Sequence, residues 1–336
     1  MKIFRLKVLV RDLRLTVCEI SLLIFLFWAT VWPIVFPNWM SGQTKQVSDN
    51  DIISDIEICS HDSNFTADDR PDCPLMAPNL VSYFDVLTKI DNQLIESIAA
   101  KYDIRIGGRR EPRHCRSGQQ VAIVVPFRNR WTHLSLFLQH MHRFLSEQLI
   151  DYTIFIVEQN DTKAFNRGKL FNIGFVESNK LQSFCCFIFH DIDVLPMNQK
   201  QLYYCSHTPR HVCSHLDKFR FVLIYPNLIG GVVAITKSHY QSVNGYSNGF
   251  EGWGAEDDDF YNRIQAKSLI LTRWSPHISR CIMLKHKRQK PNPNRKSLLE
   301  SGKSLYDTDG LNSLDDTYKV VAINFQPLYT LIKVQL

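Results

Sequence analysis

The feature that most constrains the fold is a series of short apolar runs, each followed at once by polar or charged residues. Residues 121–125, 152–157 and 186–189 are rich in β-branched or aromatic side chains, as strands buried on both faces of a sheet are. Residues 231–235 form a fourth candidate, and apolar side chains recur at helical spacing over 131–149. Strands that alternate with helices predict an α/β domain with a mostly parallel central sheet.

Ligands of such sheets bind beyond the carboxyl ends of the strands, so the residues that follow each run are the first candidates for a site. Arg128 and Arg130 follow the first run, and two guanidinium groups on one loop match the oxygens of a diphosphate. Two solvated charges would give the same pattern. Phe165 and Arg167 follow the second run, where an aromatic ring beside an arginine suits a stacked nucleotide base, a weak signal in isolation.

An acidic pair follows the third run. The spacing of two between Asp191 and Asp193 places both carboxylates on one side of a strand end, where they repel each other unless a cation or hydrogen-bond donors satisfy them. Such a pair is a known arrangement for holding a divalent metal against a nucleotide diphosphate, although a surface turn gives the same short pattern more often. Met283 and His286 precede a hydrophilic loop that ends near residue 296, but a lone histidine is usually not a metal ligand.

The segment 252–259 carries a sharper signal. Its sequence, Gly-Trp-Gly-Ala-Glu-Asp-Asp-Asp, places four consecutive acids at an expected helix start, and interaction with the helix dipole would need only one or two. A crowded carboxylate cluster raises some of its own pKa values, which suits a general base. Glycines on both sides of Trp253 would let its ring move as a lid over a ligand.

The amino terminus has a different character. Residues 20–36 carry no charge, and their length is near the minimum that spans a bilayer core of about 30 Å. Basic residues precede this run and the charge excess disappears after it, so the positive-inside rule places the amino terminus in the cytosol. A cleaved signal peptide is the alternative, but the run is long for one and no small-residue cleavage site follows. We therefore expect a cytosolic tail (1–14), a transmembrane signal-anchor helix (15–36) and a single-pass type II topology.

Residues 37–72 are expected to form a flexible stem, because they are polar and acidic and show no sustained helical period. Asn64 lies in a glycosylation sequon, which agrees with a lumenal location, and a second sequon at Asn160 lies in the globular part. That part, residues 73–336, can bury a sizeable core, because 45% of the whole chain is hydrophobic. The net charge of +6 is weak evidence for an anionic partner, and the anchor argues against a nucleic-acid-binding role.

The motifs, taken in order, resemble those of one known family. They are PFRNR (126–130), FNRGKLFNIGF (165–175), FHDIDVLP (189–196), IGGVVA (229–234), NGYSNGFEGWGAEDDDF (244–260), MLKH (283–286) and DGLNSL (309–314). This order resembles the β-1,4-galactosyltransferases, which are animal Golgi enzymes, from about Cys73 to the carboxyl end. The pair FNRGKLFN with GWGAEDDDF is highly specific. The resemblance implies a glycosyltransferase A-type α/β domain in the Golgi lumen, attached to the Golgi membrane through the stem and the anchor.

The resemblance also implies a manganese cofactor and a set of ligand contacts. Mn2+ would be held by Asp193, Met283 and His286, and a soft thioether ligand argues against magnesium, which prefers oxygen. The donor, a UDP-sugar, would contact Pro126, Phe127, Arg128, Arg130, Phe165, Asn166, Arg167, Asp191, Ile192, Asp193, Leu228, Gly231 and Trp253. The acceptor, a terminal β-linked N-acetylglucosamine, would contact Ala255, Glu256, Asp257, Asp258 and Arg295.

The reaction implied by the resemblance is inverting transfer of a sugar to the 4-hydroxyl of the acceptor, on a glycoprotein or a glycolipid. Asp257 would be the general base that takes the hydroxyl proton, and Glu256, the second catalytic carboxylate, would meet the donor sugar. Closure of Trp253 and the loop 284–300 would exclude water. A catalytically silent member that acts as a lectin or chaperone is the alternative from another class, but the implied metal ligands and base are all present.

The nine cysteines divide into two implied pairs and five others. The resemblance implies the disulfides Cys73–Cys115 and Cys186–Cys205. Cys18 lies in the predicted membrane segment. The pairing of four more stays open: Cys59, Cys185, Cys213 and Cys281.

Leu228 bears on which sugar is transferred. Vertebrate galactosyl members of the family carry Tyr at this position, and invertebrate relatives with Ile or Leu there transfer N-acetylgalactosamine. An aliphatic side chain leaves room for an N-acetyl group, so we expect UDP-N-acetylgalactosamine as the donor, with UDP-galactose as the alternative. Ala255 replaces a more usual Gly, Lys296 stands where an aromatic residue often packs on the acceptor, and the 284–296 loop is shorter than in mammalian members. The choice between N-glycan and glycolipid acceptors therefore stays open.

Overall fold

The computed structural model describes residues 44–57, 69–287 and 289–336. Within these ranges no helix is long and apolar enough to cross a bilayer. Several features predicted from the sequence lie outside the described residues, namely the cytosolic tail (1–14), the signal-anchor helix (15–36), the Asn64 sequon, Cys18 and Cys59.

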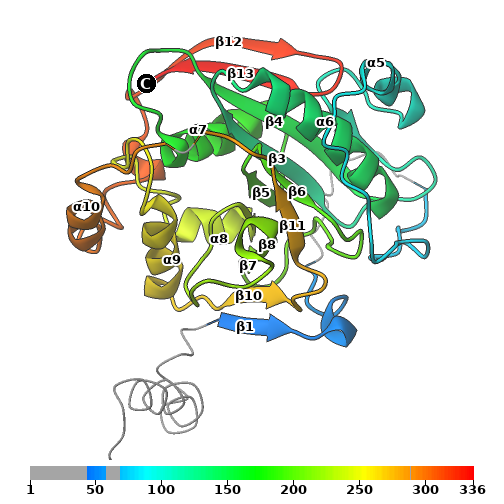
Figure 1. Ribbon diagram of the computed structural model, residues 1–336, viewed down its shortest axis with the longest axis horizontal. Helices are drawn as coiled ribbons and strands as arrows, with labels where there is room; N and C mark the ends of the chain where they lie inside the picture. The colour runs from blue at the N-terminus through cyan, green and yellow to red at the C-terminus, as the bar shows by residue number, and fades with distance from the viewer. Residues whose placement is uncertain (1–43, 58–68, 288) are drawn as a thin grey trace, which may run out of the picture. The chain divides into compact units, whose positions relative to one another are not determined.

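The centre of the fold is a ten-stranded mixed sheet (Figure 1). Its order is β1-β10-β7-β9-β5-β3-β4-β13-β12, with β2 paired to β4. β3 pairs in parallel with both β4 and β5, and β4 pairs in parallel with β13. The strands are β1 (Thr44–Val47), β2 (Arg109–Arg110), β3 (Gln120–Phe127), β4 (Asp151–Gln159), β5 (Cys186–His190), β7 (Arg210–His211), β9 (Val232–Thr236), β10 (Leu271–Trp274), β12 (Lys319–Phe325) and β13 (Thr330–Gln335).

The three apolar runs of the sequence form β3, β4 and β5, which confirms the α/β prediction. The predicted parallel arrangement holds at this centre. The fourth run forms β9, but β9 is antiparallel to β5. The chain passes from β5 to β9 through short strands and a 3-10 turn rather than through a crossover helix, and only a crossover brings the chain back in the same direction.

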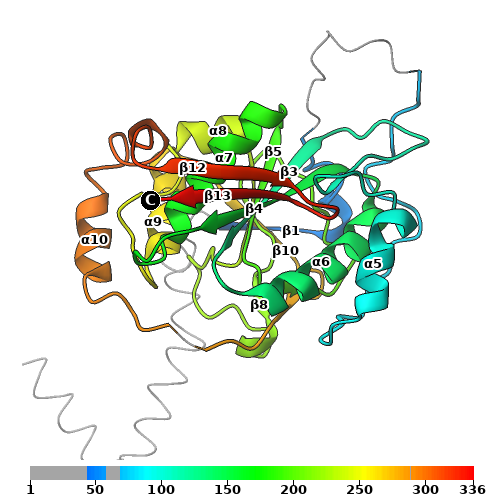
Figure 2. The same ribbon diagram turned by 90° about the horizontal axis from the view of Figure 1, so that it is seen from above.

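Helices cover both faces of the sheet. Val121, Ile123 and Val125 of β3 belong to the core cluster that contains the apolar side of α6, whereas Ala122 and Val124 belong to the cluster that contains α7. Side chains of a strand alternate between faces, so a strand covered on both faces is apolar throughout. Figure 2 shows α7 and α8 on one side of the sheet and α5 and α6 on the other. The α-helices are α5 (Asn92–Lys101), α6 (Trp131–Leu145), α7 (Arg167–Leu181), α8 (Lys237–Ser242), α9 (Glu256–Ala266) and α10 (Arg295–Gly302), and the 3-10 helices are η2 (Asp49–Asp51), η3 (Ser146–Gln148), η4 (Asp217–Phe219) and η5 (Leu311–Ser313).

A second sheet of three strands follows the end of β5. Its order is β6-β11-β8, formed by β6 (Val194–Pro196), β11 (Arg280–Met283) and β8 (His215–Leu216). Met283 pairs with Val194, which directly follows Asp193 in the chain. This small sheet therefore brings the end of β11 next to the acidic pair that follows β5.

Disulfides connect these elements. The two predicted pairs, Cys73–Cys115 and Cys186–Cys205, are present. A third, Cys213–Cys281, joins β11 to the residues just before β8 and settles one pairing that the sequence left open. Cys185 is disulfide-bonded as well. The third bond cross-links the small sheet two residues before Met283.

Part of the predicted stem is folded. Residues 44–57 contain β1, which pairs in parallel with β10, and the turn η2. Val47, Ile52 and Ile56 are buried in the core. The predicted flexible stem (37–72) therefore does not extend through 44–57. This segment has no alternating apolar pattern, but a few isolated apolar side chains are enough to hold its strand against the sheet.

A buried ion pair holds this segment against the sheet. Asp55 pairs with Arg210 of β7, whose side chain is 0% exposed, and the guanidinium lies over the ring of Trp274 at 4.5 Å from the ring centre. Burial lowers the pKa of Arg210 to about 10, although the Asp55 charge opposes that change. Removing the partner of a buried charge is strongly destabilising.

We expect Asp55→Ala to lower the free energy of unfolding by about 3 kcal/mol, because it leaves the Arg210 guanidinium buried without a carboxylate. Asp51→Ala is the matched control, since Asp51 lies in the same segment, is exposed and accepts a hydrogen bond from Ser48. Urea unfolding of both variants beside the wild type measures the difference. Equal midpoints for the two variants would show that Asp55 does not stabilise Arg210.

Candidate active site

Arg167 lies at the centre of the candidate site. It is the first residue of α7, where the Asn166 side chain accepts a hydrogen bond from the backbone N–H of Lys169 and caps the helix. Its Nε lies 2.6 Å from Asp191 Oδ1, and its Nη1 lies 2.6 Å from Asp257 Oδ1. The Arg167 side chain is 12% exposed. This guanidinium joins the residue that follows β5 to the start of α9.

The four acids that begin α9 do not act as one cluster. Glu256 Oε1 lies 3.6 Å from Arg167 Nη1, on the same side as Asp257. Asp259 pairs with Arg263 one turn later, at 2.6 Å, and both of these side chains are fully buried. At about 100° per residue, Asp257 and Asp259 point about 200° apart around the helix axis. Glu256 and Asp257 therefore face the site, whereas Asp259 forms its ion pair in the protein interior.

Two residues near these acids were not among the predicted site residues. Tyr225 OH donates a hydrogen bond to Asp258 Oδ1 at 3.2 Å. Gly230 lies so close to Asp257 that a Cβ at this position would be 2.6 Å from Oδ2. Tyr225 lies in an irregular loop without a local pattern, so the sequence offered no signal for it. The Gly-Gly pair at 230–231 was a signal, and the contact with Asp257 explains why a side chain is excluded there.

Burial changes the protonation of two carboxyl groups in the site. It raises the pKa of Glu256 to about 7, with the Asp257 charge adding to the rise and Arg167 opposing it. It also raises the pKa of Asp191 to about 6, against the lowering effect of Arg167. Carboxyl groups that titrate near neutral pH suit proton transfer and substrate binding at a charged centre.

Two of the three predicted metal ligands are in contact. His286 Nδ1 lies 2.7 Å from Asp193 Oδ2, which also lies 2.9 Å from Arg130 Nη1. Met283 lies at the end of β11, beside β6, and its sulfur is 3.7 Å from Lys218 Nζ. In the described part of the chain no group of three or more His, Cys, Asp or Glu side chains is placed to hold a metal. A metal at this position therefore depends on the Met283 thioether as the third ligand.

The partners of Asp193 keep its carboxyl group ionised. Burial by itself would raise the pKa of Asp193, but hydrogen bonds and charges of His286 and Arg130 lower it overall. The hydrogen bond to Asp193 in turn raises the pKa of His286. Asp193 is therefore held in its ionised form, as a metal ligand must be. A carboxylate, an imidazole and a thioether together suit Mn2+ better than Mg2+, which prefers oxygen.

The remaining predicted donor-binding residues lie near the ends of β3, β4 and β5 and just before β9. The Arg128 guanidinium stands over the Phe165 ring, 5.2 Å from its centre, and donates to the carbonyl of Lys163. The Gly231 carbonyl accepts a hydrogen bond from the Asp191 N–H at 2.8 Å, so these two predicted donor-binding residues lie side by side. Three other predicted contacts have side chains that are buried in the protein: Pro126, Phe127 and Ile192.

Trp253 and Arg295 lie together at the start of α9. Trp253 is 44% exposed, and its carbonyl accepts a hydrogen bond from the Asn292 N–H at 3.0 Å. Arg295 is the first residue of α10, and a Cβ on Gly254 would be 2.9 Å from Arg295 Cδ. Ala255 has a φ of 72°, in the left-handed region that favours glycine. The hydrogen bond from Asn292 to Trp253 and the close approach of Arg295 to Gly254 therefore keep the predicted lid residue next to a predicted acceptor-binding residue.

Comparison with known proteins agrees with this arrangement. A family model described as the N-terminal region of glycosyl transferase group 7 matches residues 73–206, and one described as the N-terminal domain of galactosyltransferase matches residues 210–287. Beta-1,4-galactosyltransferase 1 of Mus musculus is 41% identical over 272 residues, which are 79% of this chain and 67% of that protein. The chain belongs to the β-1,4-galactosyltransferase family. Beta-1,4-galactosyltransferase 4 of Cricetulus griseus is 37% identical over 281 residues, 83% of this chain and 81% of that protein.

Solved structures of this family share the fold. A mutant of Drosophila β-1,4-galactosyltransferase 7 in complex with manganese, UDP-Gal and xylobiose has a TM-score of 0.55 and 28% identity, and the match covers 65% of this chain and 94% of that chain. The catalytic domain of the same enzyme in complex with xylobiose has a TM-score of 0.54 and 30% identity. The mixed α/β glycosyltransferase A-type fold expected for the family is therefore confirmed.

We expect Glu256 to make the free energy of unfolding fall as the pH rises from about 5 to about 8. A carboxyl group whose pKa is raised by folding stabilises the fold below its unfolded pKa, 4.5, and this contribution is lost as the pH rises through about 7. Glu256→Gln, which stays neutral, should remove this component, at most about 1.4 kcal/mol per pH unit. Glu251→Gln, at an exposed glutamate, is the control. Urea unfolding across this range measures the slopes, and identical slopes in Glu256→Gln and the wild type would contradict the assignment.

Proposed function

We propose that this chain is an inverting β-1,4-glycosyltransferase that transfers a sugar from a UDP-sugar to the 4-hydroxyl of a terminal N-acetylglucosamine, with Mn2+ as cofactor. The observation that carries the proposal is the convergence of Arg167, Asp191 and Asp257 in a fold that also brings His286 to Asp193. Family membership supports it, because the relatives bear the name β-1,4-galactosyltransferase. A further support is the Drosophila relative solved with manganese, UDP-Gal and xylobiose.

Asp257 is the proposed general base. Arg167 Nη1 holds Asp257 Oδ1 at 2.6 Å, which fixes the orientation of the carboxylate, and Gly230 leaves room beside Oδ2. The acceptor 4-hydroxyl would lose its proton to Asp257 as its oxygen attacks the donor sugar from the side opposite the diphosphate. A single in-line displacement converts an α-linked donor sugar into a β-glycoside. Glu256, which also lies near Arg167 Nη1, would contact the donor sugar.

The residues that would hold the metal are Asp193, Met283 and His286. When bound, Mn2+ would neutralise the negative charge that builds on the departing diphosphate. Arg128 and Arg130 would bind the phosphate oxygens, since guanidinium groups match them in shape and charge. Closure of Trp253 over the donor would limit transfer to water.

The donor sugar has two candidates. The names of the relatives favour galactose over the N-acetylgalactosamine predicted from Leu228, and we propose UDP-galactose first. Leu228 is the specific observation in favour of the second. Its side chain is half-buried. Its backbone is held in place, because its carbonyl accepts a hydrogen bond from Arg273 Nη2 at 2.6 Å and its N–H donates to the Tyr225 carbonyl at 3.3 Å. A leucine offers an N-acetyl group more room and apolar contact than a tyrosine would.

We further propose that the reaction takes place in the Golgi lumen, in a single-pass type II protein that modifies glycoprotein or glycolipid glycans. The disulfides of the described residues support an oxidising compartment. An enzyme is favoured over a silent lectin or chaperone because the proposed base is paired with Arg167 and two of the proposed metal ligands are in contact.

We expect the purified protein to transfer sugar from at least one of the two UDP-sugars to a β-linked N-acetylglucosamine acceptor in the presence of Mn2+, and a chelator should abolish transfer. Asp257→Asn should lower kcat by about 100-fold to 10,000-fold, because it removes the base. Asp316→Asn is the control, at an exposed position with a φ of 61° that asparagine tolerates. A labelled-sugar transfer assay measures both. No transfer from either donor would refute the proposed function, and equal activity of the two variants would refute the role of Asp257.

We expect Leu228→Tyr to shift donor preference toward galactose, because the larger side chain occupies space that an N-acetyl group needs. The ratio of kcat/KM for UDP-galactose to that for UDP-N-acetylgalactosamine should rise about tenfold or more. Leu228→Met keeps the volume of the side chain and serves as the control. An unchanged ratio in Leu228→Tyr would mean that this position does not contact the sugar.

A further inference from the structure

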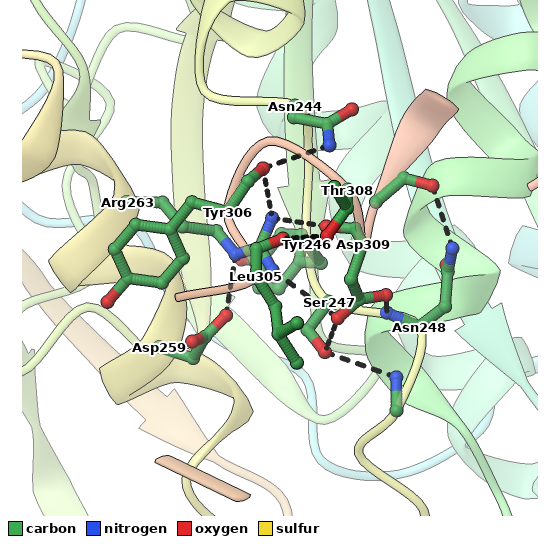
Figure 3. A network of polar contacts seen from close by, with 12 residues as sticks. Asn244, Tyr246, Ser247, Asn248, Asp259, Arg263, Leu305, Tyr306, Thr308 and Asp309 are labelled. Carbon is green, nitrogen blue, oxygen red and sulfur yellow. Dashed lines mark hydrogen bonds and ion pairs between the residues drawn. The ribbon is translucent and has the colours of Figure 1, made fainter. Parts of the chain in front are cut away.

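Two sequence motifs that the proposed function does not use, in 244–250 and 309–314, meet in the structure (Figure 3). Asp309 lies at their contact. Its Oδ1 accepts a hydrogen bond from the backbone N–H of Asn248 at 2.9 Å, and its Oδ2 accepts one from the hydroxyl of Ser247. Oδ2 also lies 3.4 Å from Nη2 of Arg263 on α9. One carboxylate therefore contacts both a loop and a helix.

The contact with the loop leads to Arg167. The carbonyl of Asn248 accepts a hydrogen bond from Asn166 Nδ2 at 2.7 Å, and its side-chain Oδ1 accepts one from Asn172 Nδ2 at 2.9 Å. Asn166 caps α7 directly before Arg167, and both Asn166 and Asn172 are buried. The loop that Asp309 holds is thus bonded to the first turns of α7.

The contact with the helix leads to Asp257. Arg263 Nη1 donates to the carbonyl of Asp309 at 2.6 Å, and Arg263 Nε pairs with Asp259 Oδ2 at 2.6 Å. The side chains of Arg263 and Asp259 are both 0% exposed. Asp259 lies two residues after Asp257, in the first turn of α9. The position of Arg263 therefore governs the turn that presents Asp257.

We propose that Asp309 is a positioning residue for the ion pair between Arg167 and Asp257. The two members of this pair stand on different helices, and their 2.6 Å contact requires that both helix starts keep their relative position. Asp309 lies on neither helix. It is bonded to the loop that contacts the start of α7 and to Arg263, which pairs with Asp259 at the start of α9. A buried ion pair such as that of Arg263 and Asp259 is a poor source of net stability, which agrees with a role in orientation.

Three variants separate this role from a general effect on folding. Asp309→Asn keeps an oxygen for the Asn248 N–H but presents no charge to Arg263. Asp307→Asn is the matched control, two residues earlier, because Asp307 is 84% exposed and pairs with Lys267 at the surface. Ser247→Ala removes one hydrogen bond from the same carboxylate and is the milder variant to use where Asp309→Asn folds poorly.

Hydrogen–deuterium exchange of the full chain tests the positioning without reliance on activity. Backbone amides at the starts of α7 and α9 should exchange about fivefold faster or more in Asp309→Asn than in the wild type or in Asp307→Asn, with smaller increases in Ser247→Ala. Amides of β3 and β4 should not change. Unchanged exchange at both helix starts overturns the proposal. A uniform increase across the domain also overturns it, because that result describes a residue that stabilises the whole fold.

Steady-state kinetics tests the consequence for the site, and this part rests on the proposed function. With Mn2+ and the UDP-sugar that the wild type uses, Asp309→Asn should lower kcat about tenfold or more and leave the donor KM within about twofold. Arg263→Lys keeps a charge beside Asp259 but cannot reach both carboxylates, so it should give the same loss, and the double variant should lose no more. An unchanged kcat, or losses that add, overturn the proposal. A wild-type chain that transfers no sugar overturns the proposed function instead, and hydrogen exchange then decides this inference alone.

Discussion

A largely buried guanidinium between carboxylates of two different elements organises the described domain. Arg167 bonds to Asp191 after β5 and to Asp257 at the start of α9. An unpaired charge in a protein interior is strongly unfavourable, so the strand end and the helix start cannot shift independently. The same crowding raises the pKa of Glu256, through burial and the neighbouring Asp257. The close packing that fixes the positions of these side chains therefore also shifts the pKa of Glu256.

The centre of the sheet could be predicted from the sequence, because β3, β4 and β5 are covered on both faces and their composition alone marks them. The direction of β9 could not be predicted, since it depends on the path between strands and not on the strand's own residues. β1 could not be predicted either. It is short, and its partner β10 lies far along the chain, so nothing local distinguishes it from a stem.

The site was predictable where its residues are contiguous in a motif. Asp191 and Asp193 follow a strand, and Glu256 and Asp257 begin a helix, so their neighbourhood is set by local structure. Tyr225 could not be found in this way, because its contact with Asp258 depends on how a loop folds back. The separate role of Asp259 also escaped prediction. It becomes visible only when helix rotation and the buried Arg263 are known.

The disulfide between Cys213 and Cys281 has a consequence for how the protein is made. Synthesis proceeds from the amino end, so β3, β4 and β5 are complete before β11 emerges, and Cys213 waits for a partner 68 residues later. The strand that carries Met283 is therefore among the later ones to be joined covalently to the domain. A reducing environment at that moment would leave the small sheet without its cross-link. We therefore expect recombinant production to succeed or fail on the oxidising conditions present during synthesis, and not only on those under which the purified protein is kept.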